Sequence, residues 1–278
     1  MRHQEPGQSV VSVAEVYEQY MVPAAFALWA TDLLALLALP PGSRVLDVAC
    51  GTGIVARTAV HHTGATGVVR GPDLHAGMLA MACAQAPTAA WVQGSASALP
   101  FPTSAFDVVV CQQGFQFCPD RLTALREMYR VLRPGGHVAL VVWGALDHNP
   151  GYAALAQGLA HHLGTAVAAV LHTSFSLGDA AVVQHLLEQA GFHGVGLSRS
   201  VQTLRFASAE AFVRVWVQGS VLGRAGVQVH DDVLTAMASD VTAVLRPYSN
   251  AEGLGVPIVA HLAVGHTAGA CSAPRARA

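Results

Sequence analysis

The chain alternates short apolar runs with segments whose apolar residues recur at helical spacing. Five apolar runs in the first half are predicted to be strands: Val45–Val48, Thr66–Asp73, Trp91–Gly94, Phe106–Cys111 and His137–Trp143. The fourth run is apolar at every position after its second residue, which is typical of a strand buried on both faces. Because predicted helices separate the strands, the pattern indicates a parallel sheet in an α/β fold.

The N-terminal region is predicted to be helical. Val13–Tyr20 is expected to form a short helix, and a second helix is expected to begin close to Pro23 and to end near Leu39. The segment from Met21 onward is very apolar, but it contains Asp32, which would cost about 3 kcal/mol at the centre of a bilayer. We therefore expect a buried helix here and no membrane span.

The second half of the chain is expected to complete the sheet. Its predicted elements are helix and loop over residues 150–175, helices Asp179–Gly191, Ser208–Leu222 and Asp231–Leu245, and strands Val195–Phe206 and Val256–Gly265. Together the elements predict a Rossmann-like, doubly wound, mostly parallel sheet of seven strands with an antiparallel last strand. Within one domain (1–278) we expect a helical cap (1–40, loose at 1–12), a core (41–206), a helical lid (207–255), the last strand (256–266) and a disordered tail (267–278).

A glycine-rich turn joins the first strand to its helix. Gly51 and Gly53 allow a close approach of backbone to ligand, and the helix that opens at Ile54 directs unpaired N–H groups toward it. Taken alone, Gly51-x-Gly53-x-x-Ala56 also fits the dinucleotide fingerprint. Asp47 favours another ligand, because its carboxylate would repel a pyrophosphate by about 1 kcal/mol or more and would attract a cation such as the sulfonium of S-adenosylmethionine.

Asp73 ends the second predicted strand, 22 residues after Gly51. Doubly wound folds place an acid that binds ribose hydroxyls about 20 residues after the glycine motif. An alternative role is to cap the helix expected over Leu74–Ala86, and this role is compatible with ribose binding.

Five motifs in order resemble those of class I S-adenosylmethionine-dependent methyltransferases, in the branch similar to the ubiquinone/menaquinone-biosynthesis methyltransferases. They are Asp47–Gly53, Gly71–Leu79, Gly94–Phe101, Phe106–Phe117 and Leu125–Gly136. The resemblance is strong over residues 40–145 and weak elsewhere. It implies S-adenosylmethionine as the cofactor and S-adenosylhomocysteine as the product.

The motifs also imply which residues hold the cofactor. They are Tyr20, Asp47, Ala49, Gly51, Thr52, Gly53, Asp73, Leu74, Met78, Gly94, Ser95, Ala96, Gln112 and Gln113. The sequence departs from the family pattern at Pro72, where an apolar residue is usual, and at Ser95, where an Asp usually binds the adenine amine. Pro72 lacks a ladder donor and could displace the strand end, and a neutral bond from Ser95 is weaker than a charged one. Whether the two residues weaken cofactor binding is left open.

The acceptor side is less clearly marked. Gln116 and Phe117 follow the fourth strand and Trp143 ends the fifth, so all three are expected to contact the substrate. Methyl transfer is an in-line displacement that needs no protein nucleophile. If a base is used, His148 is the first candidate and Tyr17 the second.

The resemblance also implies that the N-terminal helices fold over the cofactor. This would bring Tyr17, Tyr20, Phe26 or Trp29 near the substrate. For Phe26 and Trp29 we favour plain core packing, because aromatic residues at helical spacing usually pack.

Composition narrows the possible functions. Hydrophobic residues make up 53% and charged residues 12%, enough apolar material for a large core. The net charge is −2 without a basic run, so no nucleic-acid partner is expected. All 15 basic residues are arginine, which excludes Schiff-base lysine chemistry and a phosphate-loop lysine.

Cysteine and histidine usage adds two expectations. The five cysteines lack any C-x-x-C spacing, which favours reduced thiols and a cytoplasmic location, with a Cys111–Cys118 disulfide left open. Of the 14 histidines, His61–His62 and His161–His162 are adjacent pairs without metal-ligand spacing, so we expect surface histidines and no metal site.

The sequence therefore favours an enzyme that methylates a small, apolar or aromatic molecule. The alternatives are a non-catalytic or degenerate S-adenosylmethionine-binding protein and, less favoured, an NAD(P)-dependent oxidoreductase. The acceptor, the methylated atom (O, N, C or S), the use of a base and the formation of a homodimer are left open.

Overall fold

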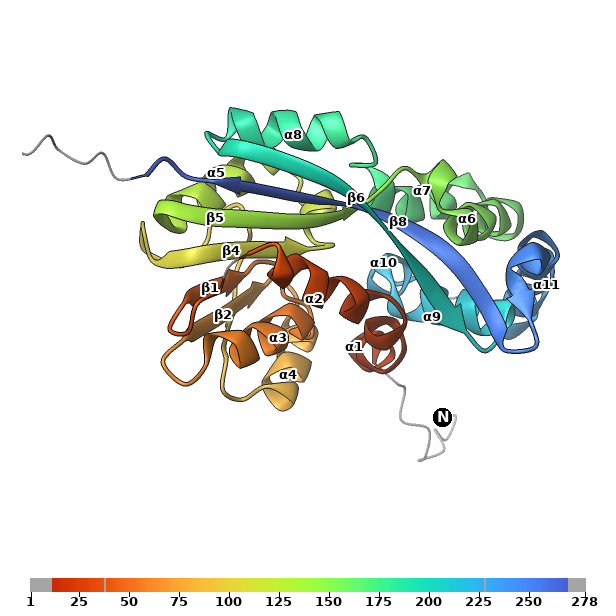
Figure 1. Cartoon of the computed structure of the whole chain (residues 1–278). Helices are drawn as coiled ribbons and strands as arrows, with labels where there is room; N and C mark the ends of the chain where they lie inside the picture. The colour runs from red at the N-terminus through yellow and green to blue at the C-terminus, as the bar shows by residue number, and fades with distance from the viewer. Residues whose placement is uncertain (1–11, 38, 228, 270–278) are drawn as a thin grey trace, which may run out of the picture.

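The computed structural model describes residues 12–37, 39–227 and 229–269 and arranges them around one twisted sheet (Figure 1). Its strand order is β3-β2-β1-β4-β5-β8-β6, and a two-residue strand, β7, pairs with β8. The strands are β1 Arg44–Asp47, β2 Val68–Asp73, β3 Ala90–Gln93, β4 Phe106–Gln112, β5 Leu132–Trp143, β6 His193–Phe206, β7 Ser249–Asn250 and β8 Gly253–His266. β1 to β5 are mutually parallel and β8 is antiparallel to β5 and β6, as predicted.

Helices cover both faces of the sheet. The α-helices are α1 Val13–Val16, α2 Ala27–Ala35, α3 Ile54–Thr63, α4 Ala76–Gln85, α5 Arg121–Val131, α6 Pro150–Leu163, α7 Thr165–His172, α8 Ala180–Gln189, α9 Ala209–Gly219, α10 Val221–Arg224 and α11 Asp231–Leu245. Single 3₁₀ turns are η2 Phe115–Phe117, η3 Leu146–His148, η4 Thr173–Phe175 and η5 Arg246–Tyr248.

The alternation of side chains along β4 divides the core in two. Val108 and Val110 pack with α2, α3, α6, α7, α9 and α11, whereas Val109 and Cys111 pack with α5 and α8. Successive strand residues point to opposite faces, so an unbroken apolar run serves both layers. The prediction of a doubly wound sheet is confirmed, and the eighth strand is the short β7 that the sequence does not mark.

The N-terminal helical region differs from the prediction. α1 continues without a break into a π-helical segment, η1 (Tyr17–Phe26), and then into α2. Pro23 lies inside η1 rather than in the first turn of a new helix. The expected boundary is therefore wrong, because the wider turns of a π-helix take up a proline that an α-helix would not tolerate.

Two other boundaries also differ. β5 begins at Leu132, which pairs with Phe106, so residues 133–136 form an irregular stretch inside the strand rather than a helix end. Thr267, where the disordered tail was expected to begin, is buried, and its N–H donates to the carbonyl of Gly136 at 2.9 Å. The rest of the expected tail, from residue 270, and the expected loose terminus, up to residue 11, lie outside the described residues.

β6 and β8 are long antiparallel neighbours that extend across the molecule to α9 and α11 (Figure 1). The helices α9, α10 and α11 therefore form an insertion between the last two long strands. In the described part of the chain no single helix is long and apolar enough to cross a membrane. The segments Thr165–Phe175 and Ala180–Gln189 reach that length and apolar composition only when taken together, and they are bent by 60° relative to each other.

Candidate active site

A cavity of about 380 Å³, here called the main cleft, opens beside the carboxyl ends of β1, β2 and β4. Ligands of open α/β sheets bind at this edge. The cleft is lined by Tyr17, Ala49, Gly51, Asp73, Leu74, His75, Met78, Gly94, Ser95, Ala96, Ser97, Gln112, Gln113, Gly114, Phe117, Cys118, Pro119 and Ala225. Ten of the residues predicted to bind the cofactor are in this set, from Ala49 to Gln113.

Asp73 ties the glycine loop to the start of α4. One carboxylate oxygen accepts the N–H of Gly51 at 2.8 Å and the other accepts the N–H of His75 at 2.9 Å. Pro72 does not displace the strand, because its carbonyl accepts the Cys50 N–H at 3.2 Å and Asp73 stays paired with Gln93. A carboxylate has about four acceptor sites, so each oxygen of Asp73 can still accept a ligand hydroxyl.

Two residues that are not glycine hold left-handed backbone at the cleft. Ala49 has a φ of 56° after β1, and Gln113 has a φ of 55° after β4. Such conformations are unfavourable for residues with a Cβ and are typical of functional loops.

Asp47 lies beneath the glycine loop instead of in the cleft. It is 1% exposed, and its carboxylate accepts the N–H of Ala56 at 3.0 Å. Burial raises the pKa of this carboxyl to about 8, the Ala56 bond opposes the shift, and the charge of Asp73 adds to it. Because Asp47 occupies a donor at the start of α3, that N–H is withheld from a pyrophosphate, which argues against a bound dinucleotide.

Three more predicted cofactor residues do not line the cleft. Gly53 lies against the ring of Trp91, which leaves no room there for a side chain. Thr52 is buried and Tyr20 is 46% exposed outside the cleft. Gly53 therefore serves packing of the loop, a role that the spacing of the motif does not reveal.

Ser95 is exposed at the rim of the cleft, and its hydroxyl accepts the N–H of Ser97 at 3.2 Å. Leu74 and Met78 supply apolar surface nearby. Cys118 is the thiol on this wall, and burial raises its pKa to about 11 against the opposing charge of Arg121. The thiol is therefore protonated at neutral pH and is no nucleophile.

A second, smaller cavity of about 40 Å³, here called the aromatic chamber, adjoins the main cleft. It is lined by Tyr17, Met21, Phe26, Gln113, Gln116, Phe117, Trp143, Ser174, Trp216 and Ser220. Three of these residues, Tyr17, Gln113 and Phe117, line both cavities and form their junction. The three predicted substrate residues Gln116, Phe117 and Trp143 are all in the chamber wall.

Aromatic rings form much of the chamber wall. Phe26 stacks on Tyr17 with ring centroids 4.8 Å apart and lies 6.1 Å from Trp143 and 6.3 Å from Trp216. Phe26 therefore lines the site, whereas Trp29 is fully buried and donates to Ser200, as the packing interpretation predicted.

Several polar atoms beside these rings are buried. The side-chain amide nitrogen of Gln116 donates to the side-chain amide oxygen of Gln113 at 3.0 Å. Among the described residues, the Gln113 amide nitrogen, the Gln116 amide oxygen and the Trp216 indole nitrogen have no hydrogen-bond partner. Buried polar groups are normally paired, so these atoms are suited to a bound molecule.

The structure does not bring every candidate base to the site. His148 lies in η3, is exposed and lines neither cavity, whereas Tyr17 lies at their junction. Sequence reasoning missed Ser174, Trp216 and Ser220, which reach the chamber through long-range packing.

Comparison with known proteins finds similarity to methyltransferases. A family model described as a methyltransferase domain matches residues 46–140. Demethylmenaquinone methyltransferase from Bacillus licheniformis is 37% identical over 113 residues, 40% of this chain and 49% of that protein. The chain therefore spans about half the length of this curated relative.

Solved structures share the fold. The YcgJ protein of Bacillus subtilis superposes with a TM-score of 0.58 at 18% identity, covering 86% of this chain and 97% of the other. A phosphoethanolamine N-methyltransferase of Haemonchus contortus, in complex with phosphomonomethylethanolamine and S-adenosylhomocysteine, has a TM-score of 0.56 at 17% identity, covering 95% and 62%.

Residues 46–140 match a methyltransferase domain, and the fold is that of solved class I S-adenosylmethionine-dependent methyltransferases. Within that class the chain is similar to the methyltransferases of ubiquinone and menaquinone biosynthesis, as its motifs predicted. The cleft fits the cofactor: Asp73 offers acceptors for ribose hydroxyls, Leu74 and Met78 offer apolar surface, and the buried amide oxygen of Gln112 has no partner.

Proposed function

We propose that this protein transfers a methyl group from S-adenosylmethionine, bound in the main cleft, to a small aromatic molecule held in the aromatic chamber. The observation that carries the proposal is the junction of the two cavities at Tyr17, Gln113 and Phe117. Donor and acceptor in adjoining cavities can be held in line, and such positioning can supply about 7–11 kcal/mol of the barrier.

The chain's own residues bind and orient the two partners. S-adenosylmethionine supplies an electrophilic methyl group on its sulfonium. Asp73 would hold its ribose, and Gly51 would lie against it without a side chain. Tyr17 borders both cavities and, since His148 is remote, is the side chain placed to orient the acceptor or to take a proton from it.

For the acceptor we propose an oxygen-bearing aromatic ring, such as a hydroquinone. Rings of Phe26, Trp143 and Trp216 suit a flat apolar molecule, and the unpaired amide and indole groups suit its oxygen atoms. The curated relative is named a demethylmenaquinone methyltransferase, which supports this class. The chamber is small in this conformation, so the acceptor must displace its wall.

We further propose that the insertion over residues 207–255 is a lid. Trp216 and Ser220 line the chamber and Ala225 lines the main cleft, so one insertion borders both cavities. A cytoplasmic location belongs to the same proposal, because Cys50, Cys83, Cys111 and Cys118 are free thiols.

The test combines titration with an assay. Calorimetry should detect binding of S-adenosylhomocysteine and none of NADH, and a panel of hydroquinones, phenols and amines should be methylated best in its hydroquinone members. Trp216→Phe keeps a ring but removes one donor, so it should raise the acceptor KM about 2–10-fold with the S-adenosylhomocysteine Kd unchanged. His148→Ala should leave both values unchanged.

Three results would contradict the proposal. Cofactor binding without transfer to any acceptor would favour a non-catalytic protein. Binding of NADH instead would favour an oxidoreductase. Loss of activity in His148→Ala would indicate that the acceptor binds outside the aromatic chamber.

A further inference from the structure

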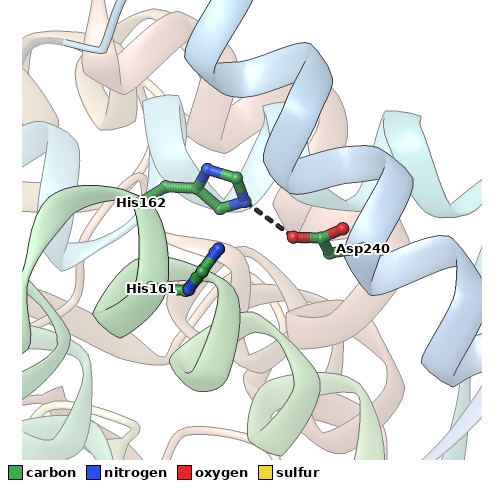
Figure 2. A group of neighbouring side chains, drawn as sticks. All are labelled: His161, His162 and Asp240. Atoms are coloured by element: carbon green, nitrogen blue, oxygen red, sulfur yellow. Dashed lines mark hydrogen bonds and ion pairs between the residues drawn. The ribbon is translucent and has the colours of Figure 1, made fainter.

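A group of three possible metal ligands lies outside both cavities. His161 and His162 are in the last turn of α6, and Asp240 is in α11 (Figure 2). Nε2 of His162 lies 2.8 Å from a carboxylate oxygen of Asp240, and one ligand atom from each of the three residues lies within 4.8 Å of the others. The sequence shows the histidine pair but not its partner, which comes 78 residues later.

We propose that His161, His162 and Asp240 form a surface site for a divalent transition metal, with zinc as the favoured ion. Two imidazoles and one carboxylate are ligands that zinc accepts, with water as the fourth. Zinc bonds of about 2.0–2.2 Å place tetrahedral ligand atoms roughly 3.3 Å apart. The ligand atoms, which lie within 4.8 Å of one another, would have to move closer together when the ion binds.

Packing of the two helices holds the ligands in place. At Gly158 a side-chain carbon would come within 2.8 Å of Met237 and 3.2 Å of Val241, so α6 and α11 cross closely. His162 lies one turn after Gly158, and Asp240 lies between the two residues that Gly158 faces. The helix faces that meet at the crossing therefore also carry the ligands.

The position of His161 distinguishes this group from a simple ion pair. The contact between His162 and Asp240 does not involve His161. The ring centroids of the two histidines lie 4.7 Å apart and the rings are nearly perpendicular, with the His161 ring beside the pair of His162 and Asp240 (Figure 2). A metal ion would use all three side chains and would clasp α6 to α11.

The clasp would act on the layer that supports the aromatic chamber. α6 carries Tyr152 near its other end, roughly 14 Å away along the helix axis. The ring of Tyr152 lies 4.7 Å from that of Trp216. Metal binding is therefore expected to stabilise this layer without entering the site.

The experiment titrates zinc chloride into the full chain, purified without a histidine tag, by calorimetry and thermal unfolding. We expect one equivalent to bind with micromolar affinity and zinc at 100 times Kd to raise Tm by about 5 °C or more. Magnesium should have no effect, because it prefers oxygen ligands. Asp240→Asn and His161→Ala should each weaken zinc binding at least tenfold.

A second histidine group provides the control. His137, His193 and His266 have neighbouring ring centroids 6.1 and 6.2 Å apart, so His193→Ala should leave zinc binding intact. Asp240 is 58% exposed at its side chain, and circular dichroism of both ligand variants would verify that they fold. Failure of the wild-type chain to bind zinc, binding unchanged in Asp240→Asn and His161→Ala, or binding lost in His193→Ala would overturn the site.

Discussion

Gly51 and Asp73 both line the main cleft and are bonded to each other there. They are 22 residues apart in the sequence, but loops at the carboxyl ends of neighbouring parallel strands lie side by side, and a 2.8 Å hydrogen bond joins the two residues. The same motif predicts that Gly53 and Asp47 contact the ligand. The packing of Trp91 and the buried bond to Ala56 decide their roles, and neither contact can be derived from motif spacing.

We expect Gly51→Val to weaken S-adenosylhomocysteine binding about tenfold or more, since a residue with a Cβ is unfavourable by about 1–2 kcal/mol in left-handed backbone. Here φ is 57°, and a Cβ would lie 3.6 Å from the Tyr17 hydroxyl, so a branched side chain would also enter the cleft. Calorimetry measures the change. Gly64→Val is the matched control, because Gly64 has a φ of 67° with no atoms within 4 Å of its Cβ position. Equal affinity in the two variants would contradict the assignment.

Asp47 should make stability depend on pH. Its pKa is raised from 3.8 to about 8 in the folded chain, by burial first and also by Asp73, although the Ala56 bond opposes the shift. Between these two pKa values the folded state holds a proton that the unfolded state has released. The stability that the raised pKa of Asp47 contributes is therefore fully present below about pH 4 and is lost as the pH rises toward 8.

The Asp47→Asn variant keeps an acceptor for Ala56 but cannot ionise. The free energy of unfolding is measured in urea for both proteins. The value for Asp47→Asn minus that for the wild type should be larger at pH 8 than at pH 5. Asp47→Ala removes the acceptor as well and should lose about 1–3 kcal/mol at both values. An equal difference between Asp47→Asn and the wild type at both pH values would contradict the role of burial.

At the scale of elements, the sequence predicts the strands better than it predicts the boundaries between elements. The apolar runs identified β1, β4 and the second half of β5, because a strand buried on both faces must be apolar throughout. The boundaries depend on local backbone geometry and strand pairing, which hydrophobic periodicity does not reveal. η1 continues through Pro23 by widening its turns, and β5 starts early because Leu132 pairs with Phe106.

The crossing of α6 and α11 gives a prediction for these elements. Gly158→Ala would place a methyl group 2.8 Å from Met237, so we expect a loss of about 1–3 kcal/mol in the free energy of unfolding. Gly77→Ala is the control, because Gly77 is helical with no neighbour within 4 Å, and it should be neutral or stabilising. Chemical denaturation measures both. Equal effects would mean that the helices do not cross closely at Gly158.

At the scale of the whole molecule, the chamber is assembled from distant parts of the chain. Tyr17 comes from the first helices, Trp143 from β5 and Trp216 from the insertion between β6 and β8. The motifs predicted the main cleft because they lie on consecutive strands. They do not predict the insertion's contribution, since its position depends on how far β6 and β8 extend beyond the end of β5.

The residues with left-handed backbone limit how far the thermal stability of the protein can be raised. Among the described residues, three that are not glycine have positive φ: Ala49 and Gln113 in the cleft and Ser104 in an exposed turn. Ser104→Gly should stabilise the fold by about 0.5–1 kcal/mol, because the relief of strain exceeds the extra freedom of the unfolded glycine. Thermal unfolding should detect it with the S-adenosylhomocysteine Kd unchanged, and a lower Tm would contradict it. The same relief is expected from glycine at 49 and 113, but Gln113→Gly would also remove an amide from the proposed acceptor site, so at that position a more stable protein is expected to bind its acceptor less well.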